Sequence, residues 1–287
     1  MRKISLNEQK LLQLEILDAV DRFCIEHSIN YSMACGTLLG AIRHGGYIPW
    51  DDDIDIYMLR EEYNRFETEF PKMYEGKYGF ATLKRYDDWT LAFGKVYDNR
   101  TYCVEKRSKS KNPGINIDVF PIDDVPDSEE EWEAYNRQRR KNLLDLRHSG
   151  MKLSPINSLL RNIGTIVYDI RFFFVDRQKL TQKISDFAQI HNHKGYHRVF
   201  ENTMGLAVKG PFRKSLFEET IYIPFEDRKY KAFKNYDEYL TAVFGDYMTP
   251  PPVEKRISFH TFDAYWKERP LEISDKHHPK RFLMEKT

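Results

Sequence analysis

Apolar residues recur every three or four positions over the first part of the chain, from Leu11 to Cys24. This is the period of one face of an α-helix. Ser5 and Glu8 precede the run at the spacing of a capping box, in which each side chain bonds to the backbone N–H of the other residue. The pattern predicts a first helix that begins directly after Ser5.

A strand period replaces the helical period from Asp51 onward. Asp53 and Asp55 alternate with Ile54 and Ile56, and side chains two positions apart on a strand point to the same face of a sheet. The alternation predicts a strand over residues 51–58 with an acidic face and an apolar face. Residues 115–119 repeat this pattern, with an aspartate at position 118 between aliphatic neighbours.

Further strand-like segments lie between residues 78 and 121, with a turn at Asp98 and Asn99. Residues 30–50 predict a short strand, a turn at Gly36 and Thr37, a short helix and a loop with glycines. After residue 127 the pattern becomes mostly helical. We therefore predict one α+β domain over residues 1–287, with a mixed β-sheet core flanked by helices in residues 1–126 and a mostly helical extension packed on it in residues 127–287.

Composition narrows the class of protein. The chain has 287 residues, enough for a sizeable core, and its net charge of +1 lacks the basic excess of a nucleic-acid binder. Its three cysteines are widely spaced and suit neither a disulfide framework nor a zinc knuckle. The first residues lack the apolar region of a secretory signal. We expect a cytoplasmic protein that binds no nucleic acid.

Two segments bear on membrane contact. Residues 163–176 are the longest apolar stretch, but Asp169 and Arg171 interrupt it, and it is shorter than the ~20 residues of a membrane span. We expect this stretch to pack in the core, with a membrane surface as the alternative. The basic residues 137–141 predict a solvated helix face, with anionic lipid or an acidic glycan as the alternative. A peripheral contact with the inner face of a membrane would therefore be reversed by salt.

The acids at positions 51–55 are the first candidate for chemistry. Carboxylates this close repel one another unless a cation or solvent offsets their charge. Asp53 and Asp55, on one strand face, offer the oxygen ligands that Mg²⁺ prefers. A solvated turn is the plainer interpretation, but the interleaved isoleucines oppose it. A calcium loop would need glycine at its sixth position, where this chain has Ile56.

Asp118 is the third candidate ligand. If its strand neighbours that of the acidic pair, three carboxylates converge on one sheet face and can hold one or two Mg²⁺ ions, with Mn²⁺ as the alternative ion. We predict that the Asp118 carboxylate lies within ~6 Å of those of Asp53 and Asp55. Asp123 and Asp124 come after a proline, and we expect them in a loop.

The order of these features along the chain resembles a known fold. Gly36 and Thr37 precede a short helix, where backbone N–H groups can approach a phosphate. A strand with paired acids follows, and then a later strand with a third acid. This order is similar to that of the nucleotidyltransferase-fold superfamily, whose members hold a metal and nucleotide phosphates with these elements.

One branch of that superfamily is similar over most of the chain. The run CGTLLGAIRHGGYIPWDDDIDI, residues 35–56, resembles the signature of the LicD family. These are the phosphorylcholine transferases of bacterial surface polysaccharides, and fukutin-type proteins are distantly similar to them. Further matches are KVYDNRT, GINIDVFPIDDVP and YLTAVFGDYMTPPP, followed by Arg256 and His260.

The resemblance implies a nucleotidyltransferase-like sheet with Asp53, Asp55 and Asp118 as metal ligands and catalytic residues. It also implies transfer of a phospho-alcohol, phosphocholine first, from a CDP-linked donor such as CDP-choline. The acceptor would be a sugar hydroxyl of a cell-surface glycan such as teichoic acid or lipopolysaccharide, free or lipid-linked, and CMP would leave. Two other classes stay open: a nucleotidyltransferase that places NMP on a small molecule or protein, and a catalytically silent glycan-binding relative.

Six residues are candidate donor contacts: Gly36, Thr37, Arg43, Lys95, Arg256 and His260. The guanidinium fork of Arg43 fits phosphate bidentately, and Lys95 can contact the leaving phosphate. A stiff proline-rich segment, residues 250–252, can carry the two C-terminal candidates back over the site. A solvated surface position is the plainer alternative for each charged residue.

Overall fold

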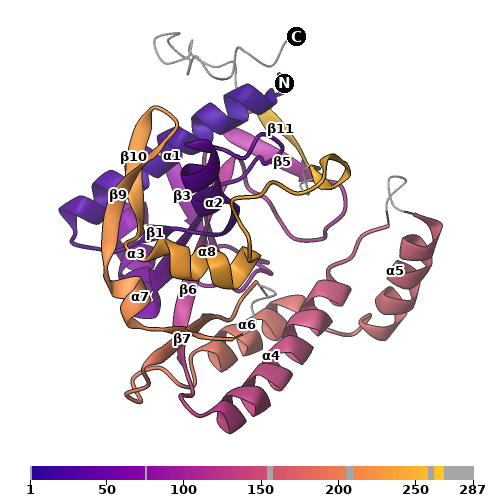
Figure 1. The fold of residues 1–287 in the computed structure, drawn as a ribbon. Helices are drawn as coiled ribbons and strands as arrows, with labels where there is room; N and C mark the ends of the chain where they lie inside the picture. Colours follow the sequence, from indigo (N-terminus) through magenta and orange to yellow (C-terminus); the bar gives the residue numbers. More distant parts are fainter. Residues whose placement is uncertain (1, 75, 154–157, 205–209, 258–261, 268–287) are drawn as a thin grey trace.

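The computed structural model of the chain describes residues 2–74, 76–153, 158–204, 210–257 and 262–267. A mixed β-sheet lies at the centre of the molecule, and a helical arm extends from one side (Figure 1). The predicted α+β class is confirmed. No helix in the described ranges is both long enough and apolar enough to cross a membrane.

Seven strands of the described residues form the central sheet, whose main path is β1-β2-β6-β4-β3. β2 and β6 run parallel, and β6 pairs antiparallel with β4 along its first half and with β7 along its second half. β8 pairs with β7 at the end of the sheet. The bounds are β1 Ser32–Met33, β2 Asp55–Leu59, β3 Tyr78–Ala81, β4 Gly94–Asp98, β6 Asn116–Val125, β7 Arg198–Glu201 and β8 Phe212–Arg213.

Two helices pack on the aliphatic face of the sheet. α1 (Leu6–Glu26) begins after the predicted capping box, and α3 (Arg60–Met73) follows β2 directly. Phe23 of α1 meets Phe66 and Phe70 of α3 edge to face, with ring centroids 5.5 and 5.3 Å apart. Both helices contact β6, so their aromatic residues close the core over this central strand.

Aromatic rings also cover part of the opposite face. Tyr57 of β2 lies 6.3 Å from the ring of Phe217 in α7 (Ser215–Glu218) and 6.0 Å from that of Tyr239 in α8 (Tyr236–Phe244). Because Tyr57 lies two positions after Asp55, both side chains share this face. The acidic end of β2 is therefore continuous with a buried aromatic wall.

β6 contains a proline where it changes neighbour. Gly94–Val119 is its last register pair with β4, and Ile122–Glu201 is its first with β7. Asp118 donates its N–H to β2, so an N–H at position 121 would point to the opposite edge, into the gap between β4 and β7. Pro121 therefore costs no ladder hydrogen bond.

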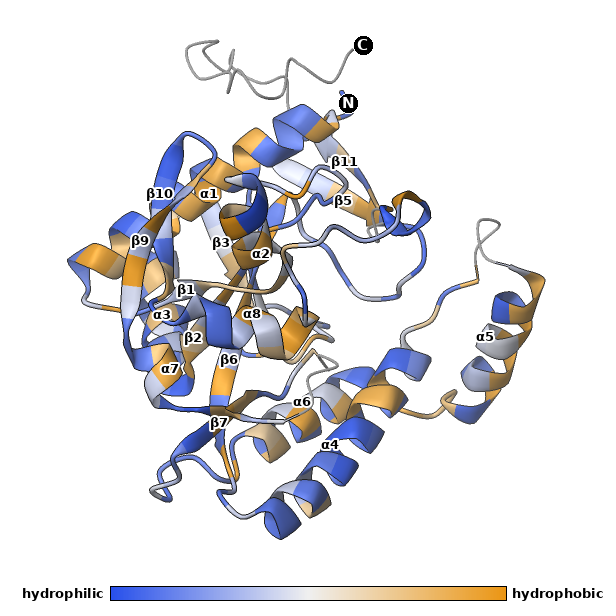
Figure 2. Cartoon of the chain, in the orientation of Figure 1, coloured by the Kyte–Doolittle hydropathy of each residue, from blue (hydrophilic) through white to orange (hydrophobic). Residues whose placement is uncertain are grey.

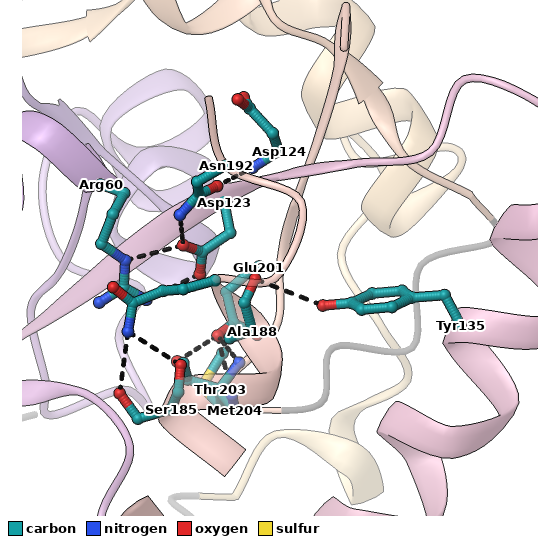
Figure 3. Close-up of polar contacts among 11 residues, drawn as sticks. Arg60, Asp123, Asp124, Tyr135, Ser185, Ala188, Asn192, Glu201, Thr203 and Met204 are labelled. Atoms are coloured by element: carbon teal, nitrogen blue, oxygen red, sulfur yellow. Dashed lines mark hydrogen bonds and ion pairs between the residues drawn. The ribbon is translucent and has the colours of Figure 1, made fainter. Parts of the chain in front are cut away.

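The predicted loop at Asp123 and Asp124 is wrong, because both lie within β6 and both charges are paired. Arg60 donates two hydrogen bonds of 2.7 Å to the fully buried Asp123 carboxylate, and Asn192 donates a third of 2.7 Å (Figure 3). Asp124 pairs with Lys214 at 2.8 Å. Paired charges let the strand continue through a segment whose composition is typical of a loop.

The prediction of a mostly helical second half holds for the arm but not beyond it. The arm contains α4 (Glu129–Ser149), α5 (Leu159–Arg171) and α6 (Arg177–Ala188). Strands then return, since β7 and β8 join the sheet. β9 (Thr220–Phe225) pairs with β10 (Arg228–Phe233), and β11 (Phe262–Trp266) pairs with β5 (Thr101–Glu105). These strands are short, and several pair with partners far away in the sequence, so local periodicity does not predict them.

The prediction that residues 163–176 pack in the core is also wrong. Within α5 the buried residue is Thr165, whereas Ile170 is 74% exposed and Phe174, after the helix, is 94% exposed. Figure 2 shows apolar residues along α5, at the end of the arm. The contacts of α5 with the rest of the arm include His148 stacked on Tyr168, with centroids 3.9 Å apart. An apolar stretch becomes part of the core only where another element packs against it. At the end of the arm few described side chains cover α5.

Replacing Arg60 with methionine should lower the free energy of unfolding by about 3–5 kcal/mol, because Asp123 would stay buried without its cation. Urea denaturation followed by circular dichroism measures the loss. Arg213→Met, which breaks the more exposed pair with Glu238, is the matched control and should cost much less. Equal losses in the two variants would show that the buried pair has no special weight.

Candidate active site

Three charged side chains form a row across neighbouring strands. Asp55 of β2 is the register partner of Asp118 in β6, and Asp118 is the partner of Lys95 in β4. Register partners point to the same face, on strands about 5 Å apart. The prediction that the strands of Asp55 and Asp118 are sheet neighbours is therefore confirmed.

Asp53 lies just before this row and outside the strand. β2 begins at Asp55, whereas the predicted strand begins at Asp51. Pairing with β6 starts where Asp118 donates its N–H to the carbonyl of Ile54 at 2.8 Å. The alternation therefore reflects sheet geometry only from Ile54 onward, and the earlier acids belong to a connecting segment.

Buried polar side chains hold that segment, and the sequence analysis missed them. Gln9 and Gln13 of α1 donate to the carbonyl of Asp52 at 2.8 and 3.0 Å. Gln13 also accepts from the hydroxyl of Tyr47 at 3.2 Å, and Glu226 accepts the N–H of Tyr47 at 2.8 Å. Two glutamines on the buried face of an otherwise apolar helix are the signal that could have revealed this anchor.

We call the carboxylates of Asp53, Asp55 and Asp118 the acidic row. The protein offsets their negative charge only in part. Asp55 is 7% exposed. Burial raises the pKa of its carboxyl well above the ordinary value, and the negative charges of Asp53, Asp118 and Asp51 raise it further, while Lys95 opposes them. The site therefore favours an added cation, which would keep the buried carboxylate ionised.

Lys95 balances one carboxylate of the row. Its ammonium donates to Asp118 and, at 3.1 Å, to Oδ1 of Asn116. Burial alone would lower the pKa of Lys95, but the charge of Asp118 and the hydrogen bond to it outweigh burial and raise the pKa. Lys95 therefore stays charged. Its contact with a donor phosphate remains a prediction.

The acids do not form a ready-made metal centre. Among the described residues, no three His, Cys, Asp or Glu side chains are placed to hold one ion together. The chemistry of the donor set nevertheless suits a hard cation, because it consists of carboxylate oxygens and the charge of Asp55 is repelled by its neighbours. The predicted separation of ~6 Å between the three carboxylates remains a prediction.

Gly36 and Thr37 lie in the first turn of α2 (Cys35–His44). The prediction places them in a turn ahead of this helix. The hydroxyl of Thr37 is buried and accepts the N–H of Asp55 at 2.8 Å, so it fixes the start of β2. A Cβ on Gly36 would lie 2.5 Å from Oδ2 of Asp51. Glycine therefore lets an acidic group approach the helix N-terminus, where negative charge is favoured.

Backbone strain marks the same corner. Cys35 has a φ of 48°, in the left-handed region that side chains disfavour. Its N–H donates to the hydroxyl of Tyr239 at 3.2 Å, and its Sγ lies 3.2 Å from the hydroxyl of Tyr57. Burial raises the pKa of the Cys35 thiol, which is therefore no nucleophile. Strain of this kind gathers at functional sites.

Two of the predicted donor contacts come together from distant parts of the chain. Arg43 donates to the carbonyl of Tyr247 at 2.8 Å, and Arg256, after the short helix η1 (Val253–Lys255), lies 5.1 Å from the ring centroid of Trp50. Burial lowers the pKa of Arg43, and repulsion from Arg256 lowers it further. Two neighbouring guanidinium groups suit a phosphate anion. His260 lies outside the described residues.

Comparisons with known proteins show which family this sequence matches. Residues 28–149 match the family described as LicD/FKTN/FKRP, nucleotidyltransferase domain. The chain is 33% identical over 269 residues to the lipopolysaccharide cholinephosphotransferase LicD of Haemophilus influenzae, covering 92% of this chain and 99% of that protein. It is also 32% identical over 87 residues to the uncharacterized protein RT0683 of Rickettsia typhi, a match that covers 30% of this chain and 28% of that protein.

Replacing Asp55 with asparagine should stabilise the metal-free protein at neutral pH. Folding raises the pKa of Asp55, so the folded protein binds the proton more tightly than the unfolded chain does. The stability that this gives at low pH is lost as the pH rises through the pKa of the folded state. The amide does not titrate. We expect the Tm of the variant in EDTA to match wild type at about pH 4 and to exceed it at about pH 8.

Differential scanning fluorimetry across this pH range measures the effect. The matched control is Asp87→Asn, an exposed acid outside the row, which should follow wild type throughout. A Tm for Asp55→Asn that stays below wild type at high pH would contradict the electrostatic account.

Proposed function

The chain belongs to the LicD family, and on that premise we propose that it is a phosphotransferase that moves phosphocholine to a sugar hydroxyl of a cell-surface glycan. The observation that carries this proposal is the alignment with a cholinephosphotransferase over 92% of the chain. Lipopolysaccharide is the acceptor class that the name of this relative favours, with teichoic acid as a second class. The acceptor is free or lipid-linked.

The donor we assign is a CDP-linked alcohol, CDP-choline first, from which CMP leaves. Arg43 and Arg256 supply adjacent positive charge, and their forks suit a diphosphate. The N-terminus of α2 at Gly36 favours negative charge as well. Thr37 is a less direct contact than predicted, because its hydroxyl already holds the backbone of β2. Lys95 stays a candidate for the leaving phosphate, and so does His260.

Mg²⁺, with Mn²⁺ as the alternative, is the cofactor that the acidic row suits. Asp53, Asp55 and Asp118 would hold it, and once bound it would offset charge on the phosphate oxygens during transfer. The raised pKa of Asp55 supports a cation at this position. Lys95 forms an ion pair with Asp118 on the shared face of the sheet.

A nucleotidyltransferase is the second candidate, because the matching family carries that domain description. Such an enzyme would place NMP on a small molecule or protein, and the same acids and arginines would serve it. The two reactions differ in which phosphorus is attacked. A fold of this class does not decide between them.

The purified chain with Mg²⁺ should release CMP from CDP-choline and place labelled phosphocholine on lipopolysaccharide that lacks it. Asp53→Asn should lower turnover by at least ~100-fold while keeping the circular dichroism spectrum, because it removes one charge from a repulsive cluster. Asp118→Asn should lower turnover as much, but it should also lower the Tm, because the largely buried Lys95 loses its ion-pair partner. Chromatography of CMP and of labelled acceptor measures both products. Asp87→Asn is the matched control.

Other outcomes identify the other classes. Labelled NMP adducts formed from nucleoside triphosphates would favour the nucleotidyltransferase. Silence across a panel of CDP-alcohols and triphosphates would leave a glycan-binding relative. Near-wild-type turnover of Asp53→Asn in Mg²⁺ would refute the acidic site.

We also propose that the protein works in the cytoplasm at the inner face of the membrane, held peripherally by α5. Its exposed apolar residues include Leu160 and Ile170, at 81% and 74% exposure, and Phe173, directly after the helix, is 75% exposed. Basic side chains lie on and beside it, among them Arg161 and Arg171. An amphipathic helix with this charge suits the surface of an anionic bilayer.

Vesicles with an anionic phosphatidylglycerol fraction should therefore bind the protein, whereas pure phosphatidylcholine vesicles should bind it much less. Replacing Phe173 and Phe174 with serine should reduce co-flotation at least several-fold, because these exposed rings would insert into the interface. Val253→Ser, which changes an exposed apolar residue of η1 and not of α5, is the control. Concentrated salt should release the protein, and release by detergent alone would contradict a peripheral attachment.

A further inference from the structure

A large cavity lies between the sheet and the helical arm. Its volume is about 830 Å³, which is within the range of pockets that hold small molecules. The segments that precede β4 and follow β5 form one wall, and α4, α5 and α6 form most of the other. None of its lining residues belongs to the acidic row or to the candidate donor contacts.

Positive charge dominates this cavity. Six arginines line it: Arg107, Arg139, Arg140, Arg147, Arg161 and Arg177. Among the described residues of its wall, none is aspartate or glutamate. Guanidinium groups gathered around a low-dielectric space attract anions and hold them by paired hydrogen bonds.

Arg139 is the first arginine without a full set of partners. It is 3% exposed, and its Nε and Nη2 both donate to Oδ1 of Asn136, at 3.0 and 2.9 Å. Its Nη1 has no hydrogen-bond partner among the described residues. Burial lowers the pKa of Arg139, and nearby Glu201 offsets this only in part. The Arg139 guanidinium also lies 4.7 Å from the ring centroid of Phe200. A buried cation with an unsatisfied donor is costly even with this contact, and an anion beside it would offset the cost. The predicted solvated face at residues 137–141 is therefore wrong at this position.

Arg177, the first residue of α6, repeats the situation. Its Nη2 donates to Oγ of Ser110 at 3.3 Å, and its Nε has no hydrogen-bond partner in the part of the chain that the structure describes. Burial lowers the pKa of Arg177, and no carboxylate acts against that shift. Arg139 of α4 and Arg177 of α6, each with one buried guanidinium nitrogen unsatisfied by the described residues, therefore line the same cavity.

The remaining wall is largely apolar and is tied together by backbone bonds. Phe93, Leu143 and Met204 contribute to it. The N–H of Lys109 donates to the carbonyl of Gly150 at 2.9 Å, which joins the segment after β5 to the end of α4. The cavity therefore combines a cationic part with an apolar part in a connected frame.

We infer that this cavity binds a phosphate-bearing ligand with an apolar portion, and that Arg139, Arg161 and Arg177 hold the phosphate. A phosphate offers several acceptor oxygens to guanidinium forks. A soluble phosphorylated compound and a phospholipid headgroup share this chemistry. α5 supplies Arg161 and Tyr168 to the wall while it exposes its apolar residues. The site is independent of the proposed phosphotransfer, since it uses other residues.

Isothermal titration of the full chain in EDTA tests the site with two probes, inorganic pyrophosphate and dihexanoyl phosphatidic acid. Arg139→Met and Arg161→Met should each weaken binding by about tenfold or more. Arg171→Met, on the same helix as Arg161 but outside the cavity, is the matched control. Arg43→Met should bind as wild type does, which excludes the donor site as the source of the signal. Asp118→Asn should also bind normally, so failure of the proposed reaction would not be mistaken for failure of this site.

The two probes also distinguish the two sources of phosphate. Binding of pyrophosphate alone indicates a soluble ligand, and tighter binding of phosphatidic acid indicates a lipid. Without ligand, Arg139→Met should keep or raise the Tm, whereas a purely structural arginine would lower it. Absence of binding by both probes, or unchanged binding in Arg139→Met and Arg161→Met, would overturn the inference.

Discussion

The parallel register of β2 and β6 is the constraint on which the candidate site depends. It places Asp55 beside Asp118 on one face of the sheet, and the partner of Asp118 in β4 is Lys95. Burial raises the pKa of Asp55, and the surrounding acids add to the effect. Folding therefore holds together charges that would separate in an open chain, and the surrounding elements must supply the free energy for it.

Acids on β6 show how the protein treats structural and candidate functional charge differently. Asp123 is fully buried but receives two hydrogen bonds from Arg60 and one from Asn192 (Figure 3). Asp124 has Lys214. These acids are neutralised within the fold, and their network joins α3 and the arm to the sheet. Among the described residues, Asp55 in β2 has no such set of partners, and Lys95 offsets its charge only in part.

Charge separation continues on the scale of the whole molecule. A net charge of +1 conceals an acidic face on the sheet and an arginine-lined cavity beside the arm. In both places burial strengthens the field of groups that solvent would otherwise screen. α5 adds an apolar surface next to the basic cavity.

The sequence by itself determined the features whose cause is local. A capping box starts α1, and a two-residue period places Asp55 and Asp118 opposite aliphatic side chains. These follow from interactions between near neighbours in the chain, and the motif of residues 35–56 was enough to indicate the family. The acid pattern also predicts a cation site, which stays a prediction.

Only the tertiary structure decided the features that depend on distant partners. Hydrogen bonds from α1 and from β6 determined where β2 starts, Arg60 kept Asp123 within a strand, and the short strands after the arm form with partners from elsewhere. The structure also brought Arg256 to Arg43 and left Ile170 of α5 exposed. Periodicity predicts which side chains share a face. Their burial and pairing depend on the elements that pack against that face, and these are brought there only when the chain folds.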